Sequence, residues 1–226
     1  MLTLHELAPL WLTLRLAAVT TLILLVVGTP IAWWLAFART RLRPLAEAIV
    51  ALPLVLPPTV LGFYLLILLN PDAPLGAGWL AVTGDTLTFS FSGLVLASVI
   101  YSLPFMVQPL QAAFVTMGRA PLAVGATLRA GPVDAFLTIA LPMSARGYLT
   151  AAVLTFAHTV GEFGVVLMIG GNIPGRTRVL SIAIYEHVET IDYAAAHALS
   201  ALLLGFSFAV LALVYWLNRA HALRVV

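Results

Sequence analysis

The sequence predicts an all-α integral membrane protein with about five transmembrane helices. Of its 226 residues, 62% are hydrophobic and only 9% are charged, and the mean hydropathy is +1.07. Soluble globular domains carry about a quarter of charged residues. The apolar residues gather in runs with few or no charges that reach the roughly 20 residues needed to cross a bilayer. The predicted spans, within a single domain over residues 1–226, cover residues 16–37, 48–69, 93–114, 148–169 and 198–217.

The first two predicted spans differ in their prolines. The first holds Pro30, which predicts a kink, and ends close to a tryptophan pair that suits the membrane interface. The second holds Pro53, Pro57 and Pro58. Because proline donates no backbone hydrogen bond, this density frees carbonyl groups that must be covered by other helices or by a water-filled cavity. We therefore expect the second span to lie inside the bundle.

Two polar stretches separate the later spans. Residues 70–91, with their prolines and glycines, are predicted to form a loop with a locally extended segment at 86–91. Residues 170–197 are predicted to form a second loop, with a short interfacial helix at 179–189. Both loops lie on the same side of the membrane when five spans are counted.

The arginines predict the orientation. Cytoplasmic segments of membrane proteins collect positively charged residues. The side that contains residues 118–147 and the C-terminus holds eight arginines, and the other side holds three. We therefore expect the 118–147 loop and the C-terminus to be cytoplasmic and the N-terminus to lie outside.

The 118–147 loop is predicted to contain two short helices with a bend between them. Pro121 is placed to begin the first, and Gly131-Pro132 ends it and begins the second. In the second helix, residues 133, 136, 137 and 140 are apolar and fall at helical spacing on one side. A helix with one apolar face that stands out of a membrane is shaped to sit in a partner's groove.

The absence of lysine excludes one chemistry. The 226 residues contain no lysine, and a phosphate-binding P-loop requires one to reach the β- and γ-phosphates. Any ATP-driven activity must therefore use an ATPase on another chain.

His158 and Glu162 are the ionisable pair of the fourth span, and their spacing places them on one helix face. Intramembrane ionisable groups indicate function by default, as in a proton relay. The alternative is structural, with the two side chains bonded to each other or to free carbonyls. A metal site lacks a third ligand, and we predict none. Gln108 and Gln111 can line a path or bond between helices.

Several segments of the chain match motifs of one family of membrane proteins. Ile139-Ala-Leu141-Pro142 matches the end of the cytoplasmic motif of ABC importer permeases, and Arg129 occupies the glycine position of that motif. Ala123-Val124-Gly125 stands where the motif has Glu-Ala-Ala, and Gly131 can supply the turn that the motif glycine would otherwise make. Together with Leu52–Gly62, Tyr101–Gln111, Leu154–Gly164 and Gly171–Arg178, these segments resemble the permease subunit of molybdate ABC importers. The resemblance implies a transport subunit that is not an enzyme and has no cofactor of its own.

The resemblance implies a type I ABC importer permease fold in the bacterial inner membrane, a homodimer that works by alternating access. It implies a cytoplasmic ATPase dimer, which binds ATP and Mg, and an extracytoplasmic molybdate-binding protein, with no nucleic acid among the partners. Tungstate and sulfate permeases are close relatives. The implied site residues fall into three groups. Coupling to the ATPase involves Leu122, Ala123, Val124, Gly125, Arg129, Gly131, Val133, Phe136, Leu137, Ile139, Leu141 and Pro142; the translocation path or gate involves Pro57, Pro58, Gln108, His158 and Glu162; and the extracytoplasmic loop facing the binding protein holds Asn172, Pro174, Gly175, Arg176 and Arg178.

Two other functions remain open. The first is an ATPase-independent channel or proton-coupled carrier that uses His158 and Glu162, and transport in liposomes without an ATPase distinguishes it. The second is a membrane enzyme acting through the same pair, which needs a further chemical group facing them. For Arg176 and Arg178, contact with an oxyanion competes with simple exposure and with pairing to Glu186 or Glu189.

Overall fold

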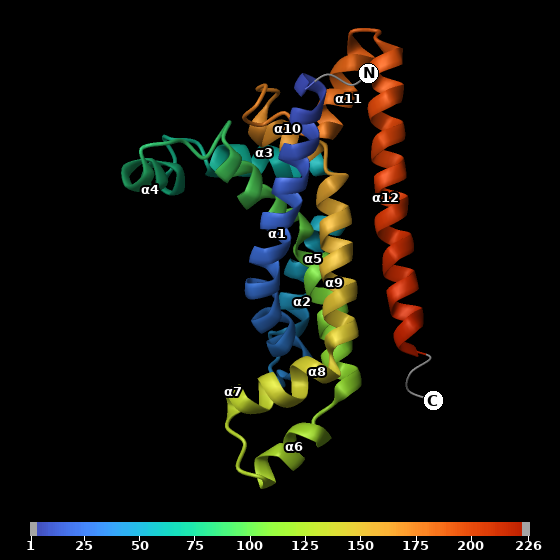
Figure 1. The fold of residues 1–226 in the computed structure, drawn as a ribbon. Helices are drawn as coiled ribbons and strands as arrows, with labels where there is room; N and C mark the ends of the chain where they lie inside the picture. The colour runs from blue at the N-terminus through green and yellow to red at the C-terminus, as the bar shows by residue number, and fades with distance from the viewer. Residues whose placement is uncertain (1–3, 223–226) are drawn as a thin grey trace.

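The computed structural model describes residues 4–222, which form helices and connecting turns with no strand. The predicted all-α class is thereby confirmed. Three long helices lie side by side at the centre of the bundle, and a fourth, α12, stands along one flank against α9 (Figure 1). Their bounds are α1, Leu4–Phe37; α5, Phe91–Met117; α9, Ala145–Val160; and α12, Tyr193–Ala222.

Close packing of α1, α5 and α9 creates the main core. Leu24, Leu110 and Ala151 are fully or almost fully buried where the three helices meet. Glycine permits the approach, because a Cβ atom on Gly28 would lie 2.8 Å from Met106 Cγ and one on Gly147 would lie 2.3 Å from Ala113 Cβ. Small residues at helix interfaces are how helices approach closely in a membrane, where lipid is as apolar as the side chains.

The described residues hold three to five candidate membrane spans, a range that includes the predicted five. Among the described residues, three helical segments are long and apolar enough to cross a membrane, namely Ala8–Phe37, Phe91–Met117 and Tyr193–Ala212. Two bent pairs of helices bring the number to five when each pair is counted as one span. The bends are where the structure differs from five simple helices.

The predicted second span is broken into two helices that meet at an angle of 110°. α2 (Arg43–Val55) ends before Leu56, and α3 begins at Pro58. Leu56 and Pro57 both have extended backbone, with ψ values of 135°. Each precedes a proline, whose ring disfavours the α-conformation in the preceding residue. The two consecutive prolines therefore redirect the chain, whereas Pro53 is accommodated inside α2.

After the break, α3 (Pro58–Leu68) packs against α10 (Gly164–Gly170). A Cβ atom on Gly62 would lie 2.7 Å from Met168 Cβ, and one on Gly164 would lie 2.9 Å from Pro58 Cβ. A larger residue at either glycine would separate the two helices. Both helices lie near the end of the bundle drawn at the top of Figure 1.

Residues 70–91 are not the predicted loop with an extended segment. They contain a helix, α4 (Pro74–Thr83), followed by turns. Pro74 occupies the first turn, and Gly84 ends the helix with a left-handed φ of 73°. Proline at the start and glycine just past the end are ordinary helix boundary signals. The high content of proline and glycine in residues 70–91 indicated a loop. In the structure, a proline and a glycine instead mark the two ends of a helix.

The predicted fourth span, 148–169, is also divided. α9 ends at Val160, residues 161–163 form no helix, and α10 follows after the break. The helix predicted at 179–189 is present as α11 (Leu180–Glu189).

Residues 118–147, which we call the elbow, contain the two predicted short helical arms (Figure 1). The first arm is α6 (Ala120–Thr127). The second begins at Pro132, as predicted, and continues through a π-helical turn to Met143 before bending by 74° into α9. Its parts are α7, Pro132–Ala135; η1, Phe136–Ala140; and α8, Leu141–Met143.

The turn between the arms lies at Arg129 and not at Gly131. Arg129 has a φ of 63°, whereas Gly131 has a φ of −71° that any residue adopts. The glycine position of the importer motif is therefore left-handed in this chain even though arginine occupies it. A non-glycine residue in this region carries a conformational cost of about 1 kcal/mol or more.

Arg129→Gly is expected to stabilise the protein by about 1 kcal/mol, because glycine adopts the left-handed conformation without the Cβ clash. The measurement is thermal unfolding of the purified protein in detergent. Gly131→Ala is the matched control, and we expect it to be tolerated, since no atom lies within 4 Å of its Cβ position. Destabilisation by Arg129→Gly would show that contacts of the arginine side chain stabilise the protein by more than the left-handed backbone conformation costs.

Candidate functional site

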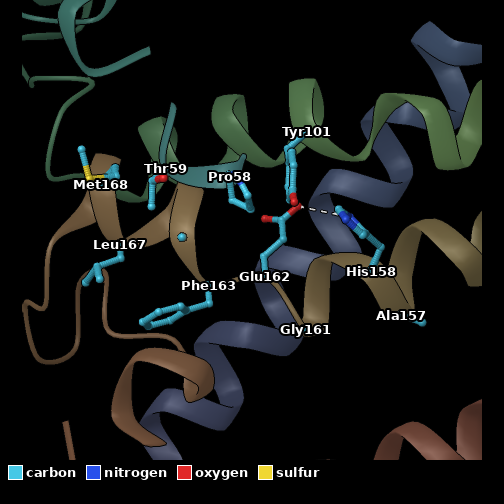
Figure 2. Close-up of a pocket in the computed structure, with 11 residues that line it drawn as sticks. Pro58, Thr59, Tyr101, Ala157, His158, Gly161, Glu162, Phe163, Leu167 and Met168 are labelled. Carbon is cyan, nitrogen blue, oxygen red and sulfur yellow. Dashed lines mark ion pairs between the residues drawn. The ribbon is translucent and has the colours of Figure 1, made fainter. Parts of the chain in front are cut away.

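A cavity of about 540 Å³ lies where the two helix breaks meet. Its walls come from the start of α3, from α5, from the last turn of α9, from the 161–163 break and from α10, as Figure 2 shows. The lining residues are Pro58, Thr59, Tyr101, Ala157, His158, Gly161, Glu162, Phe163, Gly164, Leu167 and Met168. Backbone that is not helical at membrane depth is tolerated where it lines a cavity.

Glu162 is the buried polar centre of this site, with 3% of its surface exposed. Its Oε2 accepts a hydrogen bond from Ser98 Oγ, and its Oε1 accepts one from Ser102 Oγ at 2.8 Å. Its backbone carbonyl accepts a further bond from Ser181 Oγ. The side chain therefore connects the break after α9 to α5, and its carbonyl connects the break to α11. A buried carboxyl group needs such partners, because burial without hydrogen bonds is costly.

His158 lies beside Glu162 and faces the cavity (Figure 2). Its ring stacks on Phe105 with centroids 3.9 Å apart. Its Nδ1 is 2.9 Å from Ser102 Oγ and 3.6 Å from Glu162 Oε1. The predicted proximity of the pair is present, although Glu162 lies in the break and not on the helix face. Because Ser102 donates to Glu162, its oxygen is free to accept from the histidine, which links the two side chains through the hydroxyl.

The other predicted path residues lie in different places. Pro58 lines the cavity and Pro57 forms the N-cap of α3. Gln108 is exposed on α5 and is not among the cavity residues. Gln111 makes an interhelical contact, as Nε2 donates to Glu47 Oε1 at 2.7 Å. Over residues 4–222, no three His, Asp or Glu side chains gather as a metal site would require.

The loop between α10 and α11 is held by ion pairs. Arg176 Nη2 lies 2.9 Å from Asp85 Oδ1, and Arg178 Nη1 lies 3.1 Å from Glu186 Oε2. Arg178 also donates to Asn172 Oδ1. Gly175 has a left-handed φ of 72°, and Pro174 is an exposed neighbour. Local pairing thus accounts for both arginines, and the Arg176 contact connects this loop to the one after α4.

The predicted coupling residues divide between the surface of the elbow and its inner side. Gly125 is buried, and a Cβ atom there would lie 2.5 Å from Ile139 Cδ1, so a small residue lets the two arms meet. Phe136 is half-buried and its ring packs edge-on against Trp33. The face predicted from helical spacing is therefore split, with Phe136 and the buried Ala140 turned inward. Leu122, Leu141 and Ile139 are half-buried, and Ala123, Arg129, Gly131 and Pro142 are exposed.

Five large apolar side chains remain on the surface of the elbow. They are Leu128 (78% exposed), Val133 (70%), Val124 (61%), Met143 (56%) and Leu137 (54%). Scattered apolar residues on a surface are normal, whereas a contiguous apolar patch is typical of an interaction site. The role of these residues in coupling stays a prediction.

Sequence reasoning missed three residues of these sites. Ser98 and Ser102 are four apart in the third span, a spacing that places both hydroxyls on one helix face and indicates a shared partner. Leu128 directly precedes the turn at Arg129, so it belonged to no helical pattern. The feature that could have identified Leu128 from the sequence is its position as an apolar side chain at the tip of a loop that contains charged residues.

Comparisons with known proteins agree on one family. A model described as a binding-protein-dependent transport system inner membrane component matches residues 28–225. The chain is 58% identical to the molybdenum transport system permease protein ModB of Azotobacter vinelandii, over 96% of each protein. It is 31% identical to the sulfate transport system permease protein CysT of Escherichia coli (strain K12), over 95% of this chain and 77% of that one. The fold is that of a solved chain of the MetNI methionine ABC transporter in inward-facing conformations, with a TM-score of 0.71 and 18% identity over 94% of each chain.

Proposed function

Because the chain belongs to the family of binding-protein-dependent transport system inner membrane components, we propose that it is the permease subunit of an ATP-driven importer for molybdate. The observation that carries the proposal is the 58% identity to a molybdenum transport permease over almost the full length of both proteins. Tungstate, which has the same shape and charge, is expected to follow the same route. The sulfate permease relative is more distant, at 31% identity.

The proposed partners are supported by two features of the chain, its lack of a P-loop lysine and the exposed apolar side chains of the elbow. Without a lysine it has no P-loop, so ATP and Mg are bound by a cytoplasmic ATPase dimer. The exposed apolar side chains of the elbow are the surface that this ATPase covers. A molybdate-binding protein delivers the anion at the opposite end of the bundle, where the 171–178 loop lies. A second copy of this chain completes the path.

The broken helices serve alternating access. Closure of the ATPase dimer on ATP moves the two elbows, and the two permease copies rock to open the path outward. The cavity around His158 and Glu162 lies at the junction of α3, α5, α9 and α10, so a movement of these helices changes its walls. Glu162 acts here as a structural tie, since its carboxyl oxygens are already occupied by two serines.

Uptake of radiolabelled molybdate tests the proposal. Cells that lack their own molybdate importer should accumulate the label when they produce this chain with its ATPase and binding protein. Tungstate should compete, and a large excess of sulfate should leave uptake unchanged. Equal competition by sulfate would reassign the substrate, and no uptake in the presence of all three subunits would contradict the proposal.

Labelling tests the proposed orientation, with the N-terminus outside and the C-terminus in the cytoplasm. The chain contains no cysteine, so single cysteines can be introduced without background. Asp72→Cys should react with an impermeant thiol reagent in intact cells, and Thr127→Cys on the elbow should react only after the membrane is opened. Both positions are exposed. The reverse pattern would place the elbow outside, away from any ATPase.

A further inference from the structure

Five aromatic side chains at the elbow end of the bundle form a connected group, which we call the aromatic cluster: Trp33, Phe37, Phe114, Phe136 and Tyr148. The ring of Trp33 lies at its centre, with centroid distances of 4.8 Å to Phe37, 5.1 Å to Phe114 and 5.5 Å to Phe136. Phe114 in turn lies 6.0 Å from Tyr148. All four contacts are edge-to-face, an arrangement that aromatic rings prefer.

The cluster joins four parts of the chain. Trp33 and Phe37 belong to α1, Phe114 to α5, Tyr148 to α9, and Phe136 to the second arm of the elbow. Phe114 is fully buried, which fixes the position against which Trp33 packs. Phe136 is thus the only member of the cluster on the elbow, and its ring contact within the cluster is with Trp33 of α1.

The first arm of the elbow also contacts this turn of α1, through the residue at which the arm begins. The guanidinium group of Arg119, at the N-cap of α6, lies 5.5 Å from the centroid of the Phe37 ring. Arg119 Nη2 also donates a hydrogen bond to the backbone carbonyl of Phe37. The last carbonyl groups of a helix lack hydrogen-bond donors within that helix. Arg119 therefore supplies a donor to one of the free carbonyl groups at the C-terminal end of α1. Both arms therefore hold the segment from Trp33 to Phe37.

Open space flanks this connection. One cavity of about 370 Å³ is lined by Thr29, Pro30, Trp33, Pro132 and Phe136. Another of about 380 Å³ is lined by Trp33, Phe37, Arg119, Leu122 and Ala123. Trp33 lines both, so unfilled volume borders the ring that packs against Phe136. Pro30, one turn earlier, lacks the backbone N–H that would stiffen α1 there.

We propose that Trp33 is a positioning residue for transport, the contact through which movement of the elbow is passed to α1, α5 and α9. This inference rests on the proposed function, because it concerns how ATP hydrolysis on a partner is coupled to movement of the spans. Neighbouring Trp34 is 42% exposed and is not part of the cluster. The two adjacent tryptophans thus supply a matched pair of positions.

The test is the amount of molybdate imported per ATP hydrolysed by the complete complex in proteoliposomes. Trp33→Ala should lower this ratio about tenfold, the scale of losing two or more edge-to-face contacts, while the complex stays assembled and hydrolyses ATP. Trp33→Phe should restore most of the ratio, and Trp34→Ala should leave it unchanged. An unaltered ratio in Trp33→Ala, or an equal loss in Trp34→Ala, would overturn the proposal.

A double variant tests the route through Phe136. If Phe136 acts through Trp33, then Trp33→Ala combined with Phe136→Ala should lower the ratio no further than either single change, because coupled positions are not additive. Effects that multiply would mean that the two rings act independently and would count against the proposal.

A substrate-independent readout separates this inference from the proposed function. A spin label at Thr127→Cys should become more mobile in Trp33→Ala than in Trp34→Ala, whatever the transported anion. Failure of the unmodified complex to import molybdate would contradict the proposed function alone. Unchanged label mobility in Trp33→Ala would contradict the role of Trp33 alone.

Discussion

Replacing Leu128 by aspartate is expected to abolish binding of the ATPase. Leu128 is the most exposed apolar side chain on the elbow, at 78%, and a side chain of this kind at a protein interface is covered when the partner binds. An aspartate in its place would bring an unpaired charge into that contact, at a cost of about 3–5 kcal/mol. Because the residue is exposed and makes no core contact, folding of the permease should be unaffected.

Co-purification with the ATPase is the measurement, and Leu42→Asp is the control. Leu42 is also exposed, at 66%, but it lies between α1 and α2, outside the elbow. The control should bind the ATPase as the unmodified chain does. Full retention of the ATPase by Leu128→Asp would mean that the docking surface lies elsewhere. Phe136→Asp would be a poor test of docking, because Phe136 packs inside the aromatic cluster and a charge there disrupts the elbow itself.

Glu162→Ala is expected to destabilise the protein by about 2–4 kcal/mol and to impair transport. Removing the carboxyl group takes the acceptor away from the hydroxyls of Ser98 and Ser102, and a buried donor without an acceptor costs about 1–3 kcal/mol. Glu162→Gln is the matched variant. Its amide oxygen can accept from one serine and its amide nitrogen can donate to the other, so folding and transport should be largely retained.

Thermal unfolding in detergent and molybdate uptake are the two measurements for these variants. A structural tie predicts that stability and uptake fall together in Glu162→Ala and recover together in Glu162→Gln. Loss of uptake in Glu162→Gln with normal stability and assembly would contradict this role. Glu162 would then act through its charge, as a proton-coupled mechanism requires.

The long apolar segments could be predicted because hydropathy alone reports them. α1, α5 and α12 contain the first, third and fifth predicted spans. The break at Pro57 could be expected from two consecutive prolines, whereas the break at 161–163 could not. It contains no proline, and the hydrogen bonds to the Glu162 side chain come from serines more than fifty residues away in the chain.

The elbow shows the limit of periodicity as a guide to surface and core. Its two helices and the start at Pro132 follow from local signals. Which apolar residues face outward depends on the position of Trp33 and on Gly125, which brings the arms together. The helical spacing of apolar residues within one arm reports neither of these contacts. The left-handed turn at Arg129 was likewise hidden, because arginine gives no sign of it.

Transport by this chain is expected to require ATP hydrolysis on a partner. The direct measurement is molybdate uptake into proteoliposomes that contain the permease with its ATPase, with the binding protein on the outer side. Uptake should occur only with ATP and an ATPase that hydrolyses it, and should persist when proton gradients are collapsed. Uptake by the permease alone, or uptake driven by a proton gradient, would contradict the account and support a channel or a carrier that uses His158 and Glu162.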